Sequence, residues 1–215
     1  MTLLSNTNLL VRMDQEKQIL VKYLPEKALD TIIEWIVKEK IHLRISRSRT
    51  TKLGDFRPAT KNLQHRISVN HDLNKYSFLI TLIHEIAHLL VWNKFKRKAK
   101  PHGIEWKTEF YYLMNNFLDK NVFPEDIEKA LKKYLKNAKA TCDSDLELSR
   151  CLQKYDDNPG QLVLEDIPLN SVFQIPSGRI FKKKEKLRKR YKCVCMSSKK
   201  TYLVNSLINV VLVKK

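Results

Sequence analysis

The pattern of apolar and polar residues predicts helices separated by short strands over the first 155 residues of the 215-residue chain. Helices are expected in six segments, the longest of which runs from Leu73 to Phe95, although the apolar spacing of the first segment, residues 9–22, is uneven. The other five helices are expected over residues 9–22, from Pro25 onward, after His102, over Pro124–Asn137 and over Asp143–Tyr155. The helix from Pro25 is expected to bury Leu29, Ile32, Ile33, Trp35 and Ile36.

Strands are predicted where apolar and polar residues alternate. The segments Ile41–Ser46, Thr50–Phe56 and His65–Asn70 precede the longest helix and have this character. The Gly54-Asp55 pair is expected at a turn or a bulge. The polar groups of Asn70-His71-Asp72 are expected to cap the helix that follows. We therefore expect an α+β core in which a small antiparallel sheet lies beside the longest helix.

The last third of the chain changes to short alternating segments separated by turn residues. After the core, residues 1–155, we expect a linker over residues 156–168, which include the sequence DDNPG, and a small basic all-β module over residues 169–215. The strands of this module are predicted at Ser171–Ile175, Arg179–Lys183, Lys189–Met196, Thr201–Val204 and Ile208–Val213.

One polar pattern, HEIAH, interrupts the apolar run Tyr76–Trp92. His84 and His88 lie four residues apart, so on a helix they project from one face and can bind one metal ion. Glu85 lies beside them, and in zinc hydrolases with this pattern the glutamate takes a proton from the metal-bound water. The alternative is a buried group in which two histidines and a glutamate only satisfy one another. Such burial is costly without a strong partner, which a divalent cation would be.

A third metal ligand is expected from the segment that follows the longest helix. His102 lies there, in the sequence Pro101-His102-Gly103. Three protein ligands leave a position open for water, which distinguishes a catalytic zinc site from a closed structural one. Gly103 is expected to allow the tight chain path that returns His102 to the other two ligands. His71 lies more than three helical turns from His84 and is expected to be a solvated turn residue.

The net charge of +18 indicates a polyanionic partner such as nucleic acid, or an anionic surface, and nucleic acid is the favoured interpretation. Residues 166–215 alone contain 13 Lys or Arg residues and two acidic ones, a net charge of +11. Phe181 and Tyr191 flank the densest basic cluster and are candidates for stacking on bases. A solvated hairpin whose lysines aid solubility is the alternative. The residues expected to contact nucleic acid are Lys94, Lys96, Arg97, Lys98, Lys100, Lys182, Lys183, Lys184, Lys186, Arg188, Lys189 and Arg190.

The N-terminal sequence lacks the features of a secretory signal, so a cytoplasmic location is expected. The apolar run Tyr76–Trp92 is at the short limit for crossing a bilayer and carries two histidines and a glutamate, so we expect a buried helix and no membrane association. The four cysteines, Cys142, Cys151, Cys193 and Cys195, are expected to be free thiols.

The chain resembles the SprT-like metalloprotease family, whose pattern is HExxH followed by a histidine-glycine pair and an aromatic residue. The segments that carry the resemblance are HEIAHLLVW, a basic interval and PHGIEWK. The segments KLGDFRP and HRISVNHDL are similar to strand segments of that family, and the resemblance covers residues 41–117. It implies a zincin-like metalloprotease core with one Zn²⁺ ion held by His84, His88 and His102, and with Glu85 as general base. The Spartan branch of the family cleaves proteins crosslinked to DNA. Many members also carry a zinc ribbon with paired CxxC motifs, which this sequence lacks.

These features predict a monomeric zinc-dependent endopeptidase that acts on DNA-associated or DNA-crosslinked proteins. It is expected to bind single- or double-stranded DNA without sequence specificity. Tyr111 or Tyr112 is a candidate for stabilising the oxyanion of the tetrahedral intermediate, although core packing is the stronger expectation for both. The alternative function is a non-enzymatic nucleic-acid-binding protein whose zinc only stabilises the fold. Glu85 favours the enzyme, because a structural three-histidine site does not need a glutamate.

Overall fold

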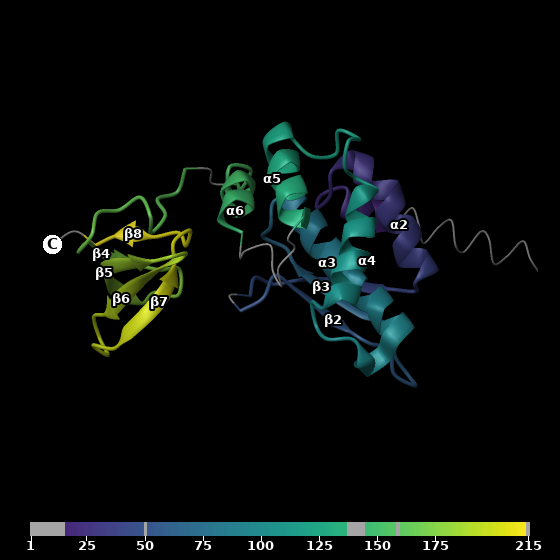
Figure 1. The fold of residues 1–215 in the computed structure, drawn as a ribbon, viewed down its shortest axis with the longest axis horizontal. Coiled ribbons are helices and arrows are strands. Elements are labelled where there is room, and N and C mark those ends of the chain that lie inside the picture. The colour runs from purple at the N-terminus through teal and green to yellow at the C-terminus, as the bar shows by residue number, and fades with distance from the viewer. Residues whose placement is uncertain (1–15, 50, 137–144, 158–159, 214–215) are drawn as a thin grey trace, which may run out of the picture. The chain divides into compact units, whose positions relative to one another are not determined.

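The computed structural model describes residues 16–49, 51–136, 145–157 and 160–213. The chain divides into two units, Met1–Cys142 and Asp143–Lys215, which are described separately (Figure 1). Both units contain helices and strands, so the predicted α+β class is confirmed. Within the described residues, no helix is both long and apolar enough to cross a membrane.

The central element of the first unit is helix α3 (Lys75–Phe95). Its apolar residues are buried on several sides, because it packs against the strands of a small sheet and against helix α4 (Ile104–Asn115) (Figure 1). The side chain of Asn74 caps α3 by accepting hydrogen bonds from the N–H groups of Tyr76 and Ser77, at 3.1 and 2.9 Å. The helix therefore begins two residues after its expected start, with a different capping residue.

The other helices of the first unit largely follow the predicted pattern. In α2 (Leu29–Lys38), the four aliphatic residues of the expected face are buried. Trp35 is only half-buried and packs edge-on against Phe117, with ring centroids 5.5 Å apart. In the helix expected over residues 9–22, residues 9–15 lie outside the described residues and residues 16–20 are helical. The remaining bounds are Glu26–Ala28 for η1, Lys96–Lys98 for η2 and Glu125–Lys136 for α5.

The sheet of the first unit has the strand order β1-β3-β2, with bounds His42–Ser46, Arg66–Asn70 and Gly54–Arg57. β2 is antiparallel to β3, but β1 is parallel to β3. The expectation of an antiparallel sheet was therefore wrong for β1, because β3 inserts between two strands that run in opposite directions. Gly54 and Asp55 lie within β2 and not at a turn. Alternate residues of β3 face α3, so its outer face remains polar.

The second unit contains α6 (Leu146–Gln153) and a five-stranded antiparallel sheet. Consecutive strands β4 to β7 are neighbours, and β8 lies on the far side of β4. The sheet is close to the predicted set of strands, although β5 is longer than expected. The strand bounds are Val172–Gln174 for β4, Ile180–Leu187 for β5, Arg190–Cys195 for β6, Thr201–Asn205 for β7 and Val211–Leu212 for β8.

The second unit extends further toward the N-terminus than the predicted module. Arg150 of α6 forms two 2.8 Å hydrogen bonds with Glu165, and Gln153 donates a 2.8 Å hydrogen bond to the carbonyl of Leu207. Leu164 and Ile167, which fall in the expected linker, are buried in the core of the sheet. The two units thus divide at 142/143, whereas the sequence pattern placed the end of the core at residue 155.

Candidate metal centre

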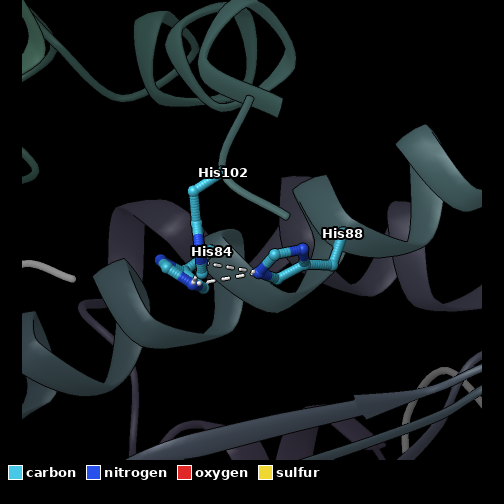
Figure 2. Close-up of side chains that lie close together, drawn as sticks. All are labelled: His84, His88 and His102. Atoms are coloured by element: carbon cyan, nitrogen blue, oxygen red, sulfur yellow. Dashed lines mark hydrogen bonds between the residues drawn. The ribbon is translucent and has the colours of Figure 1, made fainter. Parts of the chain in front are cut away.

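Three histidines meet at one point in the first unit, and these are the three that the sequence pattern singled out (Figure 2). His84 and His88 project from one face of α3, and His102 reaches them from the segment before α4. Their Nε2 atoms lie 3.2 Å apart for His84 and His88, 3.0 Å for His88 and His102, and 3.1 Å for His84 and His102. The group could hold a metal ion.

The triangle of nitrogen atoms fits a metal ion better than it fits hydrogen bonding. A ring nitrogen of a neutral imidazole either donates or accepts, so three mutually close Nε2 atoms cannot all pair with one another. Two ligands on a tetrahedral ion, with metal–nitrogen bonds of about 2.0–2.1 Å, lie roughly 3.3 Å apart. The observed separations of 3.0–3.2 Å are close to this value. A shared cation would satisfy all three lone pairs at once.

The surroundings keep the three rings in the form that binds metals. Burial, followed by the charges of the other two rings, lowers the pKa of His84 to about 3. Burial and the neighbouring His102 lower the pKa of His88 to about 4, and burial also lowers the pKa of His102. The rings are therefore neutral near pH 7, so a metal ion does not have to displace protons from them.

Trp106 packs against all three histidines and is fully buried. Its ring centroid lies 4.5 Å from that of His84, 4.8 Å from His102 and 5.4 Å from His88. Its indole N–H donates a 3.3 Å hydrogen bond to the carbonyl of His84. In the sequence, Trp106 stood out as the aromatic residue of the segment PHGIEWK. Its place in the first turn of the helix that begins directly after His102 and Gly103 was the signal that could have placed it beside the ligands.

The backbone at His102 has the strained conformation that was expected to require Gly103. His102 has a φ of 55°, in the left-handed region, whereas Gly103 has a φ of −68°. Gly103 is needed for a different reason, because a Cβ atom there would lie 3.0 Å from the carbonyl oxygen of Lys100. The N–H of Gly103 donates to that same carbonyl at 2.9 Å. The turn thus holds a candidate ligand in a conformation that non-glycine residues seldom adopt.

Glu85 is buried next to the histidines, between α3 and β2. The backbone N–H of Phe56 donates a hydrogen bond to its carboxyl group. A Cβ atom on Gly54 would lie 2.6 Å from Glu85 Oε1, so β2 can approach this closely only because residue 54 is a glycine. Burial, and secondarily the charge of Asp55, raise the pKa of Glu85 to about 8. Sequence reasoning missed this contact, because it placed Gly54 at a turn or a bulge.

Other residues near the expected site are exposed. His71 is a surface residue, as predicted. Tyr111 and Tyr112 are 46% and 64% exposed, so the expectation that they pack in the core was wrong, and a role at the oxyanion stays a prediction. The basic residues of the connecting segment, Lys94, Lys96, Arg97, Lys98 and Lys100, are all exposed, and Lys94 pairs with Glu109 at 2.6 Å.

The basic cluster of the second unit is only partly available to a ligand. Lys183 is 2% exposed, and its ammonium group donates to the carbonyls of Leu164 and Ile167, both at 2.6 Å. The expectation that Lys183 contacts nucleic acid was therefore wrong, because the alternation of β5 directs the Lys183 side chain into the core of the second unit. Lys182 and Lys184 are half-buried in β5, whereas the residues around the β5–β6 hairpin are exposed, namely Lys186, Arg188, Lys189 and Arg190.

The aromatic residues of that cluster are not available for stacking on bases. Phe181 and Tyr191 are 2% and 7% exposed and belong to the core of the second unit.

Cys151, Cys193 and Cys195 are free thiols, as predicted, and Cys142 lies outside the described residues. In the part of the chain that the structure describes, the three histidines are the one group found that could hold a metal ion.

Comparison with known proteins gives a family assignment that agrees with this geometry. No curated protein and no solved structure matches the chain. The model of the SprT-like family matches residues 21–129, about half of the chain, which include α3, the small sheet and His102. This family is generally one of metallopeptidases. The chain belongs to the SprT-like family.

Proposed function

We propose that this chain is a zinc-dependent endopeptidase of the SprT-like type that cleaves proteins associated with DNA or crosslinked to it. The observation that carries the proposal is the convergence of three histidine Nε2 atoms beside a buried glutamate. Zinc is the metal that a set of three imidazoles favours, although geometry and availability also contribute to selection in cells.

His84, His88 and His102 would hold the zinc ion, and Trp106 would hold the backbone at His84 and pack against all three rings. The bound ion supplies Lewis acidity toward water and toward a peptide carbonyl. A cation held by the three histidines would lower the pKa of Glu85 from the value of about 8 that burial gives it, so that the carboxyl group is ionised in the metal-loaded site. Glu85 would then accept the proton of the attacking water and later return it to the leaving amine. Its contacts with Phe56 and Gly54 hold the carboxyl group in place for this task.

The small sheet provides a place for the polypeptide substrate. β2 is an outer strand of the sheet and lies directly beside Glu85. An extended polypeptide can add to the free edge of such a strand through main-chain hydrogen bonds, which require no particular sequence. This mode of binding suits an enzyme that cleaves many different proteins.

The net charge of +18 supports the DNA-associated part of the proposal. Exposed lysines and arginines lie in the segment between His88 and His102, and around the β5–β6 hairpin of the second unit. Membership of the SprT-like family, whose Spartan branch cleaves proteins crosslinked to DNA, points to the same class of substrate. Localisation in the cytoplasm and a monomeric state complete the proposal.

The test is the variant Glu85→Gln, which keeps the shape of the side chain but removes its basicity. We expect unchanged zinc content and a fall of about 10²- to 10⁴-fold in cleavage of a DNA-bound protein substrate. Glu125→Gln, an exposed glutamate at the start of α5, is the matched control. Equal cleavage by Glu85→Gln would overturn the mechanism. Zinc binding by the wild-type chain without cleavage of any protein substrate would favour the alternative, a nucleic-acid-binding protein with a structural zinc.

A further inference from the structure

The outer face of the small sheet, on the side opposite α3, carries a cluster of arginines that the proposed mechanism does not use. A hollow of about 560 Å³ opens over this face. Five arginines line it, together with three serines and His42, and Asp55 is the one acidic residue among the lining residues. We call it the arginine hollow, and its arginines are Arg44, Arg47, Arg49, Arg57 and Arg66.

Strand alternation explains why these residues gather on one face. In β3, Ile67 and Val69 are fully buried, so Arg66 and Ser68 face the other way. The register places Arg57 of β2 opposite Arg66, and Arg44 of β1 opposite Ser68. Three adjacent strands therefore contribute cationic side chains to one surface.

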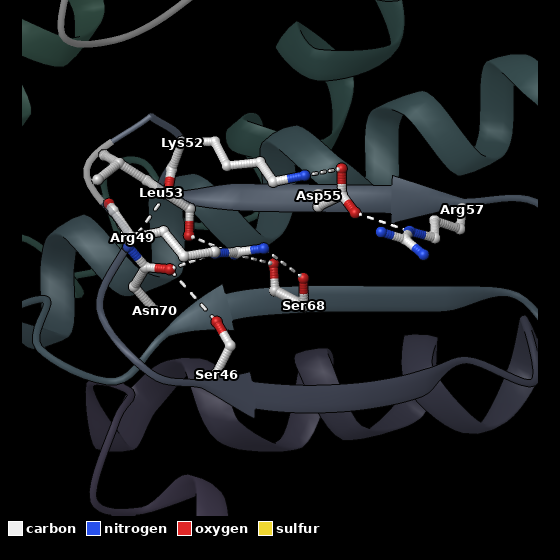
Figure 3. Close-up of polar contacts among 8 residues, drawn as sticks. All are labelled: Ser46, Arg49, Lys52, Leu53, Asp55, Arg57, Ser68 and Asn70. Atoms are coloured by element: carbon white, nitrogen blue, oxygen red, sulfur yellow. Dashed lines mark hydrogen bonds and ion pairs between the residues drawn. The ribbon is translucent and has the colours of Figure 1, made fainter.

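Two of the arginines have structural partners. Arg49 donates to Asn70 Oδ1 at 2.8 Å, to Ser68 Oγ at 3.1 Å and to the carbonyl of Leu53 at 3.3 Å, which fastens the β1–β2 connection to β3 (Figure 3). Arg57 pairs with Asp55 at 3.0 Å, and Lys52 pairs with the other oxygen of Asp55 at 2.7 Å. The single acid of the hollow is thus already neutralised by its own neighbours.

The other three arginines have no such partner. Among the described residues, none forms a hydrogen bond or an ion pair with the side chain of Arg44, Arg47 or Arg66, and all three side chains are exposed. Although burial raises the pKa of Asp55, its hydrogen bonds with Lys52 and Arg57 keep that pKa below its ordinary value. Asp55 therefore stays ionised and paired near pH 7. The charge of the three arginines remains available for an anionic ligand.

We propose that the arginine hollow binds the phosphate backbone of single-stranded nucleic acid. Guanidinium groups form forked hydrogen bonds with phosphate oxygens, and the nearby hydroxyls of Ser46, Ser48 and Ser68 are of the kind that also contact phosphates. Arg44 and Arg66 lie on different strands and Arg47 follows the end of β1, so the cationic residues are distributed along the sheet, which suits a chain of phosphates better than one isolated anion. The outer strands of the sheet lie about 10 Å apart, narrower than a duplex. The lining includes no tyrosine, tryptophan or phenylalanine, so the hollow contacts the backbone and not the bases.

This inference deepens the proposed function, since it places nucleic acid on the face of the sheet that does not carry the histidines. The test measures binding of a fluorescein-labelled oligothymidine to the full chain. Fluorescence anisotropy gives the affinity at each of a range of salt concentrations. We expect Arg44→Glu/Arg66→Glu to weaken binding at least about tenfold and to lower the salt slope by about 1.4, the value for two lost contacts with a single strand. The control Lys27→Glu/Lys129→Glu changes the net charge equally at exposed residues of η1 and α5.

Several outcomes would overturn the inference. If the control pair weakened oligothymidine binding equally, the effect of the arginine substitutions would be explained by the change in net charge alone. Full competition by a polyglutamate peptide would indicate a general anion surface, and tighter binding of a duplex would exclude the single-stranded ligand. If the charge reversal disturbs the fold, Arg44→Gln/Arg66→Gln measures the same contacts. Because binding is measured without proteolysis, and zinc-dependent cleavage of a DNA-free protein should be unchanged in these variants, failure here is distinguishable from failure of the proposed peptidase.

Discussion

Gly54 of β2 packs against the carboxyl group of Glu85 so closely that a methyl group at residue 54 would lie 2.6 Å from Glu85 Oε1 and 2.8 Å from Glu85 Cγ. We predict that Gly54→Ala displaces either Glu85 or β2. A displacement of about 1 Å can reduce catalysis about 100-fold, so cleavage should fall by up to that factor while zinc content is retained. Steady-state cleavage and metal analysis measure the two quantities.

The control for Gly54→Ala is Asn62→Ala, an exposed position in the β2–β3 connection. It should cleave at the wild-type rate. Wild-type activity of Gly54→Ala would mean that β2 can shift without consequence for Glu85, which would contradict the positioning role of this contact.

His102 is the histidine whose contribution to metal binding depends most on the tertiary fold, because it comes from outside α3. We predict that His102→Ala lowers zinc affinity by more than the 10- to 100-fold typical of lost outer-shell contacts. Competition with a chromophoric chelator measures this affinity. The matched control is His71→Ala, a histidine on the surface, which should bind zinc as the wild type does. Equal affinities for the two variants would remove His102 from the ligand set.

Lys183 stabilises the second unit by holding the chain before β4 against the sheet. We predict that Lys183→Met destabilises this unit by about 2–4 kcal/mol, since the carbonyls of Leu164 and Ile167 lose their donor while remaining buried. Faster hydrogen exchange of the β5 and β6 amides would report the loss. Lys184→Met is the control, because Lys184 is half-buried and contacts Asn170 Oδ1 at 3.2 Å.

The three tryptophans, Trp35, Trp92 and Trp106, all lie in the first unit and provide an internal check on Lys183→Met. Their fluorescence during denaturation should be unaffected by the substitution. A loss of stability confined to the first unit would contradict the assignment of Lys183 to the core of the second.

Glu165 gives the second unit a stability that depends on pH. Its hydrogen bonds with Arg150 hold its pKa below the ordinary value of 4.5. A carboxyl group whose pKa is lowered by folding stabilises the folded state above its unfolded pKa, and the effect is lost as the pH falls through the folded pKa. Glu165→Gln should therefore cost about 0.5–1 kcal/mol at pH 7, a value that allows for the partial exposure of Arg150.

At about pH 3, Glu165→Gln should differ less from the wild type than it does at pH 7. Thermal denaturation followed by circular dichroism at both pH values measures the change. A difference that is the same at the two pH values would indicate lost packing and not a lost ion pair.

The sequence predicted the histidine cluster well because its geometry is largely local. The i, i+4 spacing places His84 and His88 on one helical face whatever the rest of the fold is. His102 required only that the chain return to α3 after a short segment. The neutral state of the rings and the packing of Trp106 depend on burial, which a one-dimensional pattern does not specify.

The errors occurred where partners are distant along the chain. Parallel pairing of β1 with β3 depends on the insertion of β3 between two other strands. Lys183 looks like a surface charge in a basic run, and only strand alternation combined with the position of residues 164–167 shows that it is buried. Gly54 was assigned to a turn or a bulge because glycine is common there, whereas its neighbour Glu85 is 31 residues away in the sequence.

The three-stranded sheet offers two separate binding surfaces, the edge of β2 and the outer face that carries the arginines. With both proposals in place, a polypeptide would use main-chain groups at the edge of β2, whereas a nucleic-acid strand would use arginine side chains on the outer face, so the two ligands would not compete. A covalent protein–nucleic acid conjugate could then occupy both at once, with its junction near β2. Because β2 is four residues long, about 13 Å, the sheet would set how closely peptide cleavage can approach that junction. A short peptide would remain covalently attached to the nucleic acid after cleavage.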